Sequence, residues 1–368
     1  MHKFAFVLEQ TLGHVAHSRN VIRSLARVPE IDATVIPVDF NDPSGLYRLP
    51  GLRTWSWRAS AAARRALRDR LRQGALDAIF IHTQVAALLA VEIMRSVPTV
   101  VSLDATPRLF DLEANAYGHR IDADLVESLK HRVNLRAFEA AASLVTWCRL
   151  AADSLVSDYG IPAEKIEVIP PGVDLDRFRP ARHANRSDRL RILFVGGQFE
   201  RKGGPDLLEA VRRLDGSVEL DIVTAGAVSE IPAGVVARVH RGLRPQSAEL
   251  VDLYRSADIF VLPSRGDCMP QAVAEALGSG LPVVATRVGA ISEMVRDGEN
   301  GRLVAARDPR ALGSALEQLV GDPAERIRMG LAGRASAERE QDADRNNRRI
   351  FDLMTRVAAE AVAEARSA

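Results

Sequence analysis

Residues 196–204, GGQFERKGG, form a glycine-rich turn that follows an apolar run and precedes an expected helix. Glycines leave backbone amides accessible, a helix N-terminus is partly positive, and Arg201 and Lys202 add two full charges. These groups together are suited to binding a diphosphate. The spacing is not that of a Walker loop, because no Ser or Thr follows the lysine. A solvated basic turn without a ligand is the alternative.

Two carboxylates, Asp267 and Glu275, lie eight residues apart after another apolar run. We expect Asp267 in a loop at the carboxyl end of a strand and Glu275 on the second turn of the following helix. Ionised carboxylates only accept hydrogen bonds, so this pair suits the hydroxyls of a sugar and a ribose. The alternative is a solvated acid beside a surface glutamate.

The loop after the first apolar run, residues 9–14, contains Gly13 and His14. Glycine lets the backbone approach a ligand, and the next helix N-terminus can hold an anion. The loop lacks the glycine spacing of a dinucleotide fingerprint. An ordinary turn between a strand and a helix is therefore the competing interpretation.

Residues 53–72 carry seven arginines and one acid, a local net charge of +6. On a helix the arginines gather opposite Ala63, Leu67 and Leu71, with two tryptophans preceding them. Such a helix can lie on an anionic bilayer. An ordinary domain helix that shows the chain's arginine bias is the alternative. The predicted basic face consists of Arg58, Arg64, Arg65, Arg68 and Arg72.

Short apolar runs alternate with helical patterns along the whole chain, which predicts doubly wound parallel sheets. Two proline-preceding aspartates, Asp308 and Asp322, predict helix starts, and residues 348–365 predict a final amphipathic helix. The predicted strands are 4–8, 33–38, 78–81, 99–103, 144–147, 166–169, 192–195, 220–224, 259–262, 282–285 and 302–304.

The break at Pro170-Pro171-Gly172 divides the chain into two α/β domains. We expect a first domain over 1–172, a linker over 173–189 and a second domain over 190–344. The helix 345–368 would pack back on the first domain. Tandem doubly wound domains direct their ligand loops toward a crevice, so the fold predicts a central cleft.

The composition excludes several classes of protein. The 368 residues have a net charge of +1, so global charge does not favour a nucleic-acid partner. Cys148 and Cys268 are too few for a disulfide framework or a zinc site, which fits a cytoplasmic location. The sequence contains no run of 18 apolar residues, so it predicts no membrane span. Only four of the 49 basic residues are lysines, so Lys202 is unusual.

The motifs together resemble those of retaining GT-B glycosyltransferases of family 4, also called glycosyltransferase group 1. IPPGVDLDRFRP at 169–180 is similar to the family's linker motif, and 196–203 to its phosphate-binding loop. Asp267 and Glu275 resemble the family's E-x7-E motif. The segment 278–301 matches its glycine- and valine-rich C-terminal pattern. The match is dense over 170–305 and thinner over 1–169.

The resemblance implies transfer of a hexose-type sugar from a nucleoside-diphosphate sugar without a metal. Lys202 and Arg201 would neutralise the leaving diphosphate beside Gly196 and Gly197. Asp267 would bind the donor sugar, helped by amides of the next two residues, and Glu275 would bind the ribose. A loop on the first domain would face the phosphate or acceptor. The residues so implied in that domain are Gly13, His14, Asp104 and His119, and the two amides belong to Cys268 and Met269.

Three positions depart from the family's pattern. Gly197 stands where the family usually has an arginine. Arg201 would bind the same phosphate from the other end of the loop. Asp267 is one methylene shorter than the usual glutamate. Leu103 lies near the place of a histidine in many members, and Asp104 or His119 would take its role.

We therefore expect a front-face retaining transferase in bacterial envelope polysaccharide or glycolipid synthesis, acting on a saccharide or lipid-linked acceptor. The expected location is cytoplasmic, with peripheral attachment to the inner face of the membrane. A nucleotide-sugar-binding protein without catalysis and a transferase with a small soluble acceptor are the alternatives.

Overall fold

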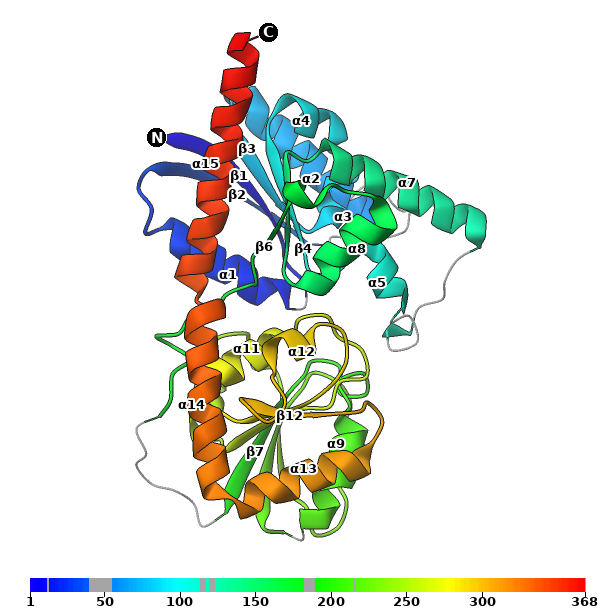
Figure 1. The fold of residues 1–368 in the computed structure, drawn as a ribbon, viewed down its shortest axis with the longest axis vertical. Coiled ribbons are helices and arrows are strands. Elements are labelled where there is room, and N and C mark those ends of the chain that lie inside the picture. The colour runs from blue at the N-terminus through cyan, green and yellow to red at the C-terminus, as the bar shows by residue number, and fades with distance from the viewer. Residues whose placement is uncertain are drawn as a thin grey trace. The chain divides into compact units, whose positions relative to one another are not determined.

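The computed structural model describes residues 1–11, 13–39, 55–112, 117–118, 123–181, 189–214 and 216–367. The chain divides into two compact units (Figure 1). Unit 1 comprises Met1–Ala114, Arg120–Pro170 and Asp344–Ala368, and unit 2 comprises Asn115–His119 and Pro171–Ala343.

Unit 1 contains a six-stranded sheet in the order β2-β1-β3-β4-β5-β6, with every neighbouring pair parallel. Parallel strands covered on both faces consist of continuous apolar runs, as the sequence predicts here. The strands are β1 His2–Glu9, β2 Ile31–Val38, β3 Ala78–His82, β4 Thr99–Leu103, β5 Ser143–Thr146 and β6 Ile166–Val168.

Helices cover both faces of this sheet (Figure 1). Along β1, Val7 faces a cluster with α2, while Phe6 and Leu8 face a second cluster with α1 and α15. This alternation follows from the two-residue period of a strand. The helices are α1 His14–Leu25, α2 Trp55–Arg72, α3 Gln84–Ala87, α4 Val91–Ser96, α5 Pro107–Leu112, α7 Asp124–Ala140, α8 Arg149–Tyr159 and α15 Ala343–Ser367.

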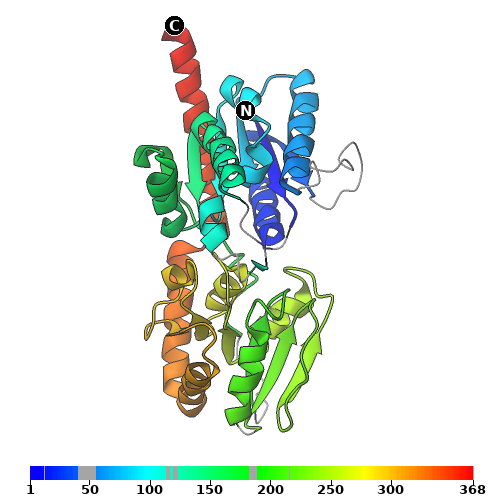
Figure 2. The ribbon, with the colours of Figure 1, turned by 90° about the vertical axis from the view of Figure 1, so that its right-hand side faces the viewer.

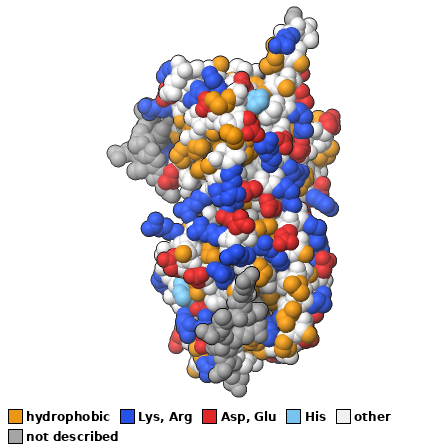
Figure 3. Space-filling view, turned by 90° about the vertical axis from the view of Figure 1, so that its left-hand side faces the viewer, with side chains coloured by type: hydrophobic (Ala, Val, Ile, Leu, Met, Phe, Trp, Pro, Cys, Tyr) orange, Lys and Arg blue, Asp and Glu red, His pale blue; other side chains and the backbone are white. Residues whose placement is uncertain are grey.

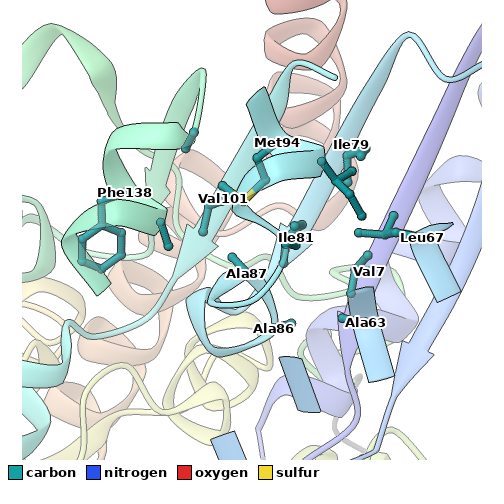
Figure 4. Packing of buried hydrophobic residues seen from close by; sticks show 14 of the residues in the cluster. Val7, Ala63, Leu67, Ile79, Ile81, Ala86, Ala87, Met94, Val101 and Phe138 are labelled. Atoms are coloured by element: carbon teal, nitrogen blue, oxygen red, sulfur yellow. The ribbon is translucent and has the colours of Figure 1, made fainter. Parts of the chain in front are cut away.

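Figure 4 shows the first of these two clusters, in which branched strand residues meet small helix residues. Alanines on α2 and α3 let these helices lie close to the sheet, and Leu67 fills the remaining space beside β1 and β3. The labelled residues are Val7, Ala63, Leu67, Ile79, Ile81, Ala86, Ala87, Met94, Val101 and Phe138.

The last helix, α15, packs on unit 1 although it follows unit 2 in the chain. Ile350, Phe351 and Met354 lie in the cluster with Phe4 and Phe6. Polar contacts fasten its start, since Ser24 donates to Asp344 over 2.7 Å and Asn346 donates to the Pro170 carbonyl over 3.0 Å. Its exposed final turns extend past the sheet (Figures 1 and 2).

Unit 2 contains a second parallel six-stranded sheet, in the order β12-β11-β10-β7-β8-β9. The two sheets confirm the predicted fold class. One strand, β9, was missed because its residues are partly exposed and form no continuous apolar run. The strands are β7 Leu190–Val195, β8 Val218–Val223, β9 Val236–His240, β10 Ile259–Leu262, β11 Val283–Thr286 and β12 Gly301–Val304.

Two helices of unit 2 begin as the aspartate–proline pairs predict. The Asp308 carboxylate accepts from the Ala311 amide over 2.8 Å, and Asp322 accepts from the Glu325 amide over 2.9 Å. Each cap satisfies an amide that the first helical turn leaves unpaired. The helices are α9 Gly204–Val211, α10 Ala248–Ser256, α11 Gln271–Gly278, α12 Ile291–Met294, α13 Pro309–Gly321 and α14 Pro323–Glu340.

The described part of the predicted linker lies against unit 2. The Val173 amide donates to the Gln341 carbonyl over 2.7 Å, and Phe178 is fully buried. Arg334 on α14 donates to the carbonyls of Leu175, Phe178 and Gly278 over 2.7–3.1 Å. These hydrogen bonds satisfy backbone groups of the linker and of the end of α11.

The helix α2 shows the predicted faces in part. Ala63 and Leu67 are buried, while Arg65, Arg68 and Arg72 are exposed. Arg53 and Thr54, at the start of the predicted basic segment, lie outside the described residues. No helix in the described ranges is long and apolar enough to cross a membrane. On the face shown in Figure 3, Lys/Arg and Asp/Glu side chains are interspersed.

Each sheet has one place where the strand order reverses. In unit 1 the loops after β1 and β3 flank this place, and in unit 2 the loops after β7 and β10 do so. Ligands of doubly wound sheets bind outside the carboxyl ends of the strands at such a point. The candidate sites are therefore expected in these loops.

Candidate active site

In unit 2, the loops after β7 and β10 carry the predicted diphosphate and sugar residues. Lys202 ends the first loop and Asp267 lies in the second. The Lys202 ammonium contacts the Asp267 carboxylate, with side chains only 13% and 10% exposed. Burial lowers the pKa of Lys202, an effect that the Asp267 charge opposes. The pair therefore places a cation beside a carboxylate that can accept hydrogen bonds from hydroxyl groups.

The close approach of these two loops depends on Gly203. Its φ of +78° belongs to the left-handed region, and a Cβ there would lie 1.8 Å from the Pro263 carbonyl oxygen. A side chain at this position would therefore push the loops apart. Gly196 is similarly constrained, because its Cβ would lie 2.8 Å from Cγ of Lys202.

The structure leaves open space at Gly197, where no atom of the described residues beyond its two chain neighbours lies within 4 Å of an added Cβ. The absence of the family's usual arginine there is thus not imposed by packing. Arg201 donates to Oε1 of Gln198 over 2.5 Å and to the Gly266 carbonyl over 2.6 Å. The Tyr117 ring lies 4.5 Å from its guanidinium carbon. Arg201 therefore joins the two loops, a role that the sequence did not indicate.

Glu275 lies on α11 and is buried. Burial raises the pKa of its carboxyl to about 7, opposed by a hydrogen bond from the Tyr254 hydroxyl. Tyr254 is itself held between Phe178 and Phe260, with ring centroids 5.4 and 5.7 Å away. Burying a carboxylate without a cation partner costs free energy. A hydrogen bond from a ligand hydroxyl would lower that cost. Sequence reasoning missed Tyr254, whose spacing from Glu275 carries no motif.

In unit 1, the corresponding loops meet at Glu9, the last residue of β1. The Thr83 hydroxyl donates to Oε2 of Glu9 over 2.6 Å, and the Thr11 hydroxyl donates to Oε1. Burial raises the pKa of Glu9. Glu9 was not among the predicted site residues, although a charged residue at the end of an apolar strand is a usable signal.

The predicted residues His14 and Asp104 lie together beside Glu9. Nε2 of His14 is 3.8 Å from Oε1 of Glu9 and 3.9 Å from Oδ2 of Asp104. Its other ring nitrogen, Nδ1, is hydrogen-bonded to Nε2 of His82 over 2.9 Å. Burial lowers the pKa of His82 well below its usual value, which favours its neutral form. Two carboxylates near Nε2 favour hydroxyl ligands over anions at this point.

A second buried histidine, His17, packs edge-on against His82, and the Trp147 ring stacks on His82 at 5.0 Å. Burial lowers the pKa of His17 to about 3. Across the described ranges, no three His, Cys, Asp or Glu side chains are arranged to hold a metal ion. Gly13 precedes α1, as predicted, whereas His119 lies outside the described residues.

Comparison with known proteins identifies the family. The model described as "Glycosyltransferase Family 4" matches residues 11–177, and that described as "Glycosyl transferases group 1" matches 189–322. A D-inositol 3-phosphate glycosyltransferase of Paenarthrobacter aurescens is 32% identical over 296 residues, covering 74% of this chain and 71% of that protein. The chain belongs to glycosyltransferase family 4.

Other relatives of this glycosyltransferase differ in name and coverage. An MMP alpha-(1->4)-mannosyltransferase of Mycolicibacterium hassiacum is 34% identical over 206 residues, or 53% of this chain and 49% of that protein. Sucrose-phosphate synthase from Thermosynechococcus elongatus has a similar structure, with a TM-score of 0.77 at 16% identity over 98% and 100% of the two chains. Anabaena HepE in complex with UDP-glucose gives 0.69 at 17% identity over 96% and 100%.

These comparisons establish the class of reaction and the GT-B fold. The glycosyltransferase is a retaining enzyme that uses a nucleotide-sugar donor, in the EC 2.4 class. The sequence-based family, fold class and enzyme class are thereby confirmed. The roles of individual residues, the sugar and the acceptor remain predictions.

Proposed function

We propose that this enzyme transfers a hexose-type sugar from a nucleoside-diphosphate sugar to a saccharide or lipid-linked acceptor by front-face displacement. The contact between Lys202 and Asp267, at the point where the sheet order of unit 2 reverses, carries the proposal. A fixed cation stabilises the charge of a diphosphate, and a carboxylate beside it can accept hydrogen bonds from the hydroxyls of a sugar.

The proposed reaction needs no side-chain nucleophile. As the bond from the anomeric carbon to the diphosphate breaks, negative charge grows on the leaving oxygen and Lys202 neutralises it. The acceptor oxygen attacks on the same face, and its proton passes to the departing diphosphate. Arg201 would assist by binding the diphosphate. The backbone of residues 196–197 and 268–269 would contact the donor, and Glu275 would accept from the ribose.

Unit 1 is proposed to bind the acceptor. Glu9 and Asp104 lie within 4 Å of Nε2 of His14, an arrangement suited to a polyol hydroxyl. A small soluble acceptor is the second candidate, because the first relative named above is a D-inositol 3-phosphate glycosyltransferase. A binding protein without catalysis would also contain these residues but would release no diphosphate.

The test proceeds from donor to acceptor. UDP- and GDP-sugars are compared by thermal shift, because a ligand of the folded state raises its melting temperature. The stabilising donor is then incubated with lipid-linked saccharides, free saccharides and inositol phosphates, and diphosphate release is measured. We expect release with a lipid-linked or free saccharide. Release with inositol phosphate alone would favour the soluble acceptor, and donor binding without release in any mixture would contradict transfer.

Peripheral attachment through residues 53–72 is proposed for the described part, helix α2. Arg64 and Arg68 lie 3.1 and 3.8 Å from Glu92, which lies outside this segment, so part of its +6 charge is compensated. Arg72 lies 2.8 Å from Asp69, whose charge the +6 already includes. Each remaining exposed arginine near an anionic surface contributes roughly 1 kcal/mol.

Co-sedimentation with vesicles checks this attachment. We expect binding to vesicles containing phosphatidylglycerol, little binding to phosphatidylcholine vesicles, and loss of binding in Arg65→Glu/Arg68→Glu. The matched variant Arg212→Glu/Arg213→Glu, in unit 2, should bind as the wild type does. Binding that does not depend on anionic lipid would reject the proposal.

A further inference from the structure

The two donor loops of unit 2 are joined by Arg265, a residue without a role in the motifs above. Its guanidinium makes a two-point contact with Asp206 at the start of α9, over 2.7 and 3.0 Å. Its remaining nitrogen, Nη1, donates to Oε1 of Glu200 over 2.6 Å. One side chain from the loop after β10 therefore reaches both the turn and the helix that follow β7.

Each of the two loops donates a hydrogen bond to a backbone carbonyl of the other. The Arg265 amide donates to the Arg201 carbonyl over 2.9 Å. In the opposite direction, the Arg201 guanidinium donates to the Gly266 carbonyl over 2.6 Å. Arg201 directly precedes Lys202, and Gly266 directly precedes Asp267. The attachment points thus lie one residue before each member of the lysine–aspartate pair.

The contact with Asp206 is the stronger part of this connection. The side chains of Arg265 and Asp206 are 15% and 12% exposed, whereas Glu200 is 76% exposed. A two-point arginine–carboxylate contact fixes direction as well as distance. Removing one partner of a buried pair leaves an uncompensated charge, but an exposed arm contributes little.

We propose that Arg265 and Asp206 are positioning residues of the transfer reaction. They set the register between the two loops and so place Lys202 against Asp267, without touching the donor themselves. This inference rests on the proposed function, since it assigns the lysine–aspartate pair to the reacting end of the donor. The contact between Arg265 and Asp206 therefore affects the stability of the transition state more than the affinity for the nucleoside diphosphate.

Two conservative variants test the proposal. Asp206→Asn preserves shape and removes charge, and Arg265→Lys preserves charge and removes the two-point contact. In both, kcat for transfer should fall by roughly 10- to 100-fold, since small misplacements of reacting groups have effects of that size. The Kd for the nucleoside diphosphate should change less than about threefold. The misplaced groups act mainly as the bond to the sugar breaks.

A matched variant separates positioning from general stability. Arg213→Ala removes another inter-element pair of unit 2, 3.0 Å from Glu317 and away from the donor loops. Arg213→Ala should retain wild-type kcat within about twofold, whatever its melting temperature. A fall in melting temperature at unchanged kcat in Asp206→Asn and Arg265→Lys would show a purely structural role and overturn the proposal. A Kd that rises in parallel with the loss of kcat would also overturn it.

Amide hydrogen exchange tests the role of Arg265 independently of whether the proposed function is correct. If the wild type transfers sugar from no donor, the proposed function fails, and the connection is judged by protection of residues 199–206 and 263–270. Protection lost in Asp206→Asn but retained in Arg213→Ala would support the role of Arg265 in holding the loops. Equal protection in both variants would overturn it.

Discussion

Replacing Lys202 by alanine should reduce kcat for sugar transfer by about 100- to 1,000-fold, the loss typical when a fixed group that stabilises developing charge is removed. Lys202 is suited to this task because it is buried and aimed at one point by Asp267. Its low exposure excludes water, which would otherwise weaken its interaction with the leaving diphosphate. Initial rates at saturating donor and acceptor measure the effect.

The variant Lys202→Ala also leaves Asp267 buried without its cation, which can unfold the loop. The double variant Lys202→Ala/Asp267→Asn removes that uncompensated charge. It should recover stability but not kcat. Lys165→Ala is a matched control, since Lys165 is another of the four lysines and donates to the Glu139 carbonyl in unit 1. A Lys202→Ala enzyme with a third of wild-type kcat would disprove the assigned role.

Glu275→Gln should bind donor roughly tenfold more weakly and yet be more stable than the wild type at neutral pH. The loss of affinity follows from replacing a charged acceptor of ribose hydroxyls by a neutral amide. The gain in stability follows from burial, which raises the pKa of Glu275 from its ordinary value of 4.5 to about 7 in the folded protein. The unfolded chain releases this proton first, so ionisation favours unfolding.

The sign of this effect defines its pH range. Below pH 4.5 the carboxyl is protonated in both states and carries no penalty. The penalty grows as pH rises to about 7 and is then constant, reaching up to roughly 3 kcal/mol. The melting temperature of Glu275→Gln should therefore exceed that of the wild type increasingly over this range. Glu317→Gln, which changes an exposed glutamate, should show no such trend. Parallel melting curves for Glu275→Gln and the wild type at every pH would contradict the assigned pKa.

Local features of the fold could be predicted from the sequence because their causes are local. The apolar runs of β1 and β10 and the caps at Asp308 and Asp322 depend on neighbours a few residues away. The strand β9 could not be predicted in this way. It is held by backbone pairing with β8, a contact that its half-exposed side chains do not reveal.

The residues of the candidate site likewise divide into those that local sequence predicts and those that depend on distant contacts. Lys202, Asp267 and Glu275 were predicted because their loop and helix positions follow from strand ends and motif spacing. His82 was missed because it contacts His14 across 68 residues. Such a contact exists only once β1 and β3 are neighbours, and strand order is a non-local property.

The amino-acid sequence by itself determined the α/β class and the chemical types of residue available to a diphosphate and a sugar. It did so because periodicity, glycine placement and charge act over short spans. Only the tertiary structure decided which loops meet, that Lys202 contacts Asp267, and that Arg201 and Arg265 join their loops. Those contacts cross 59 to 65 residues and depend on the order in which the parallel strands pair.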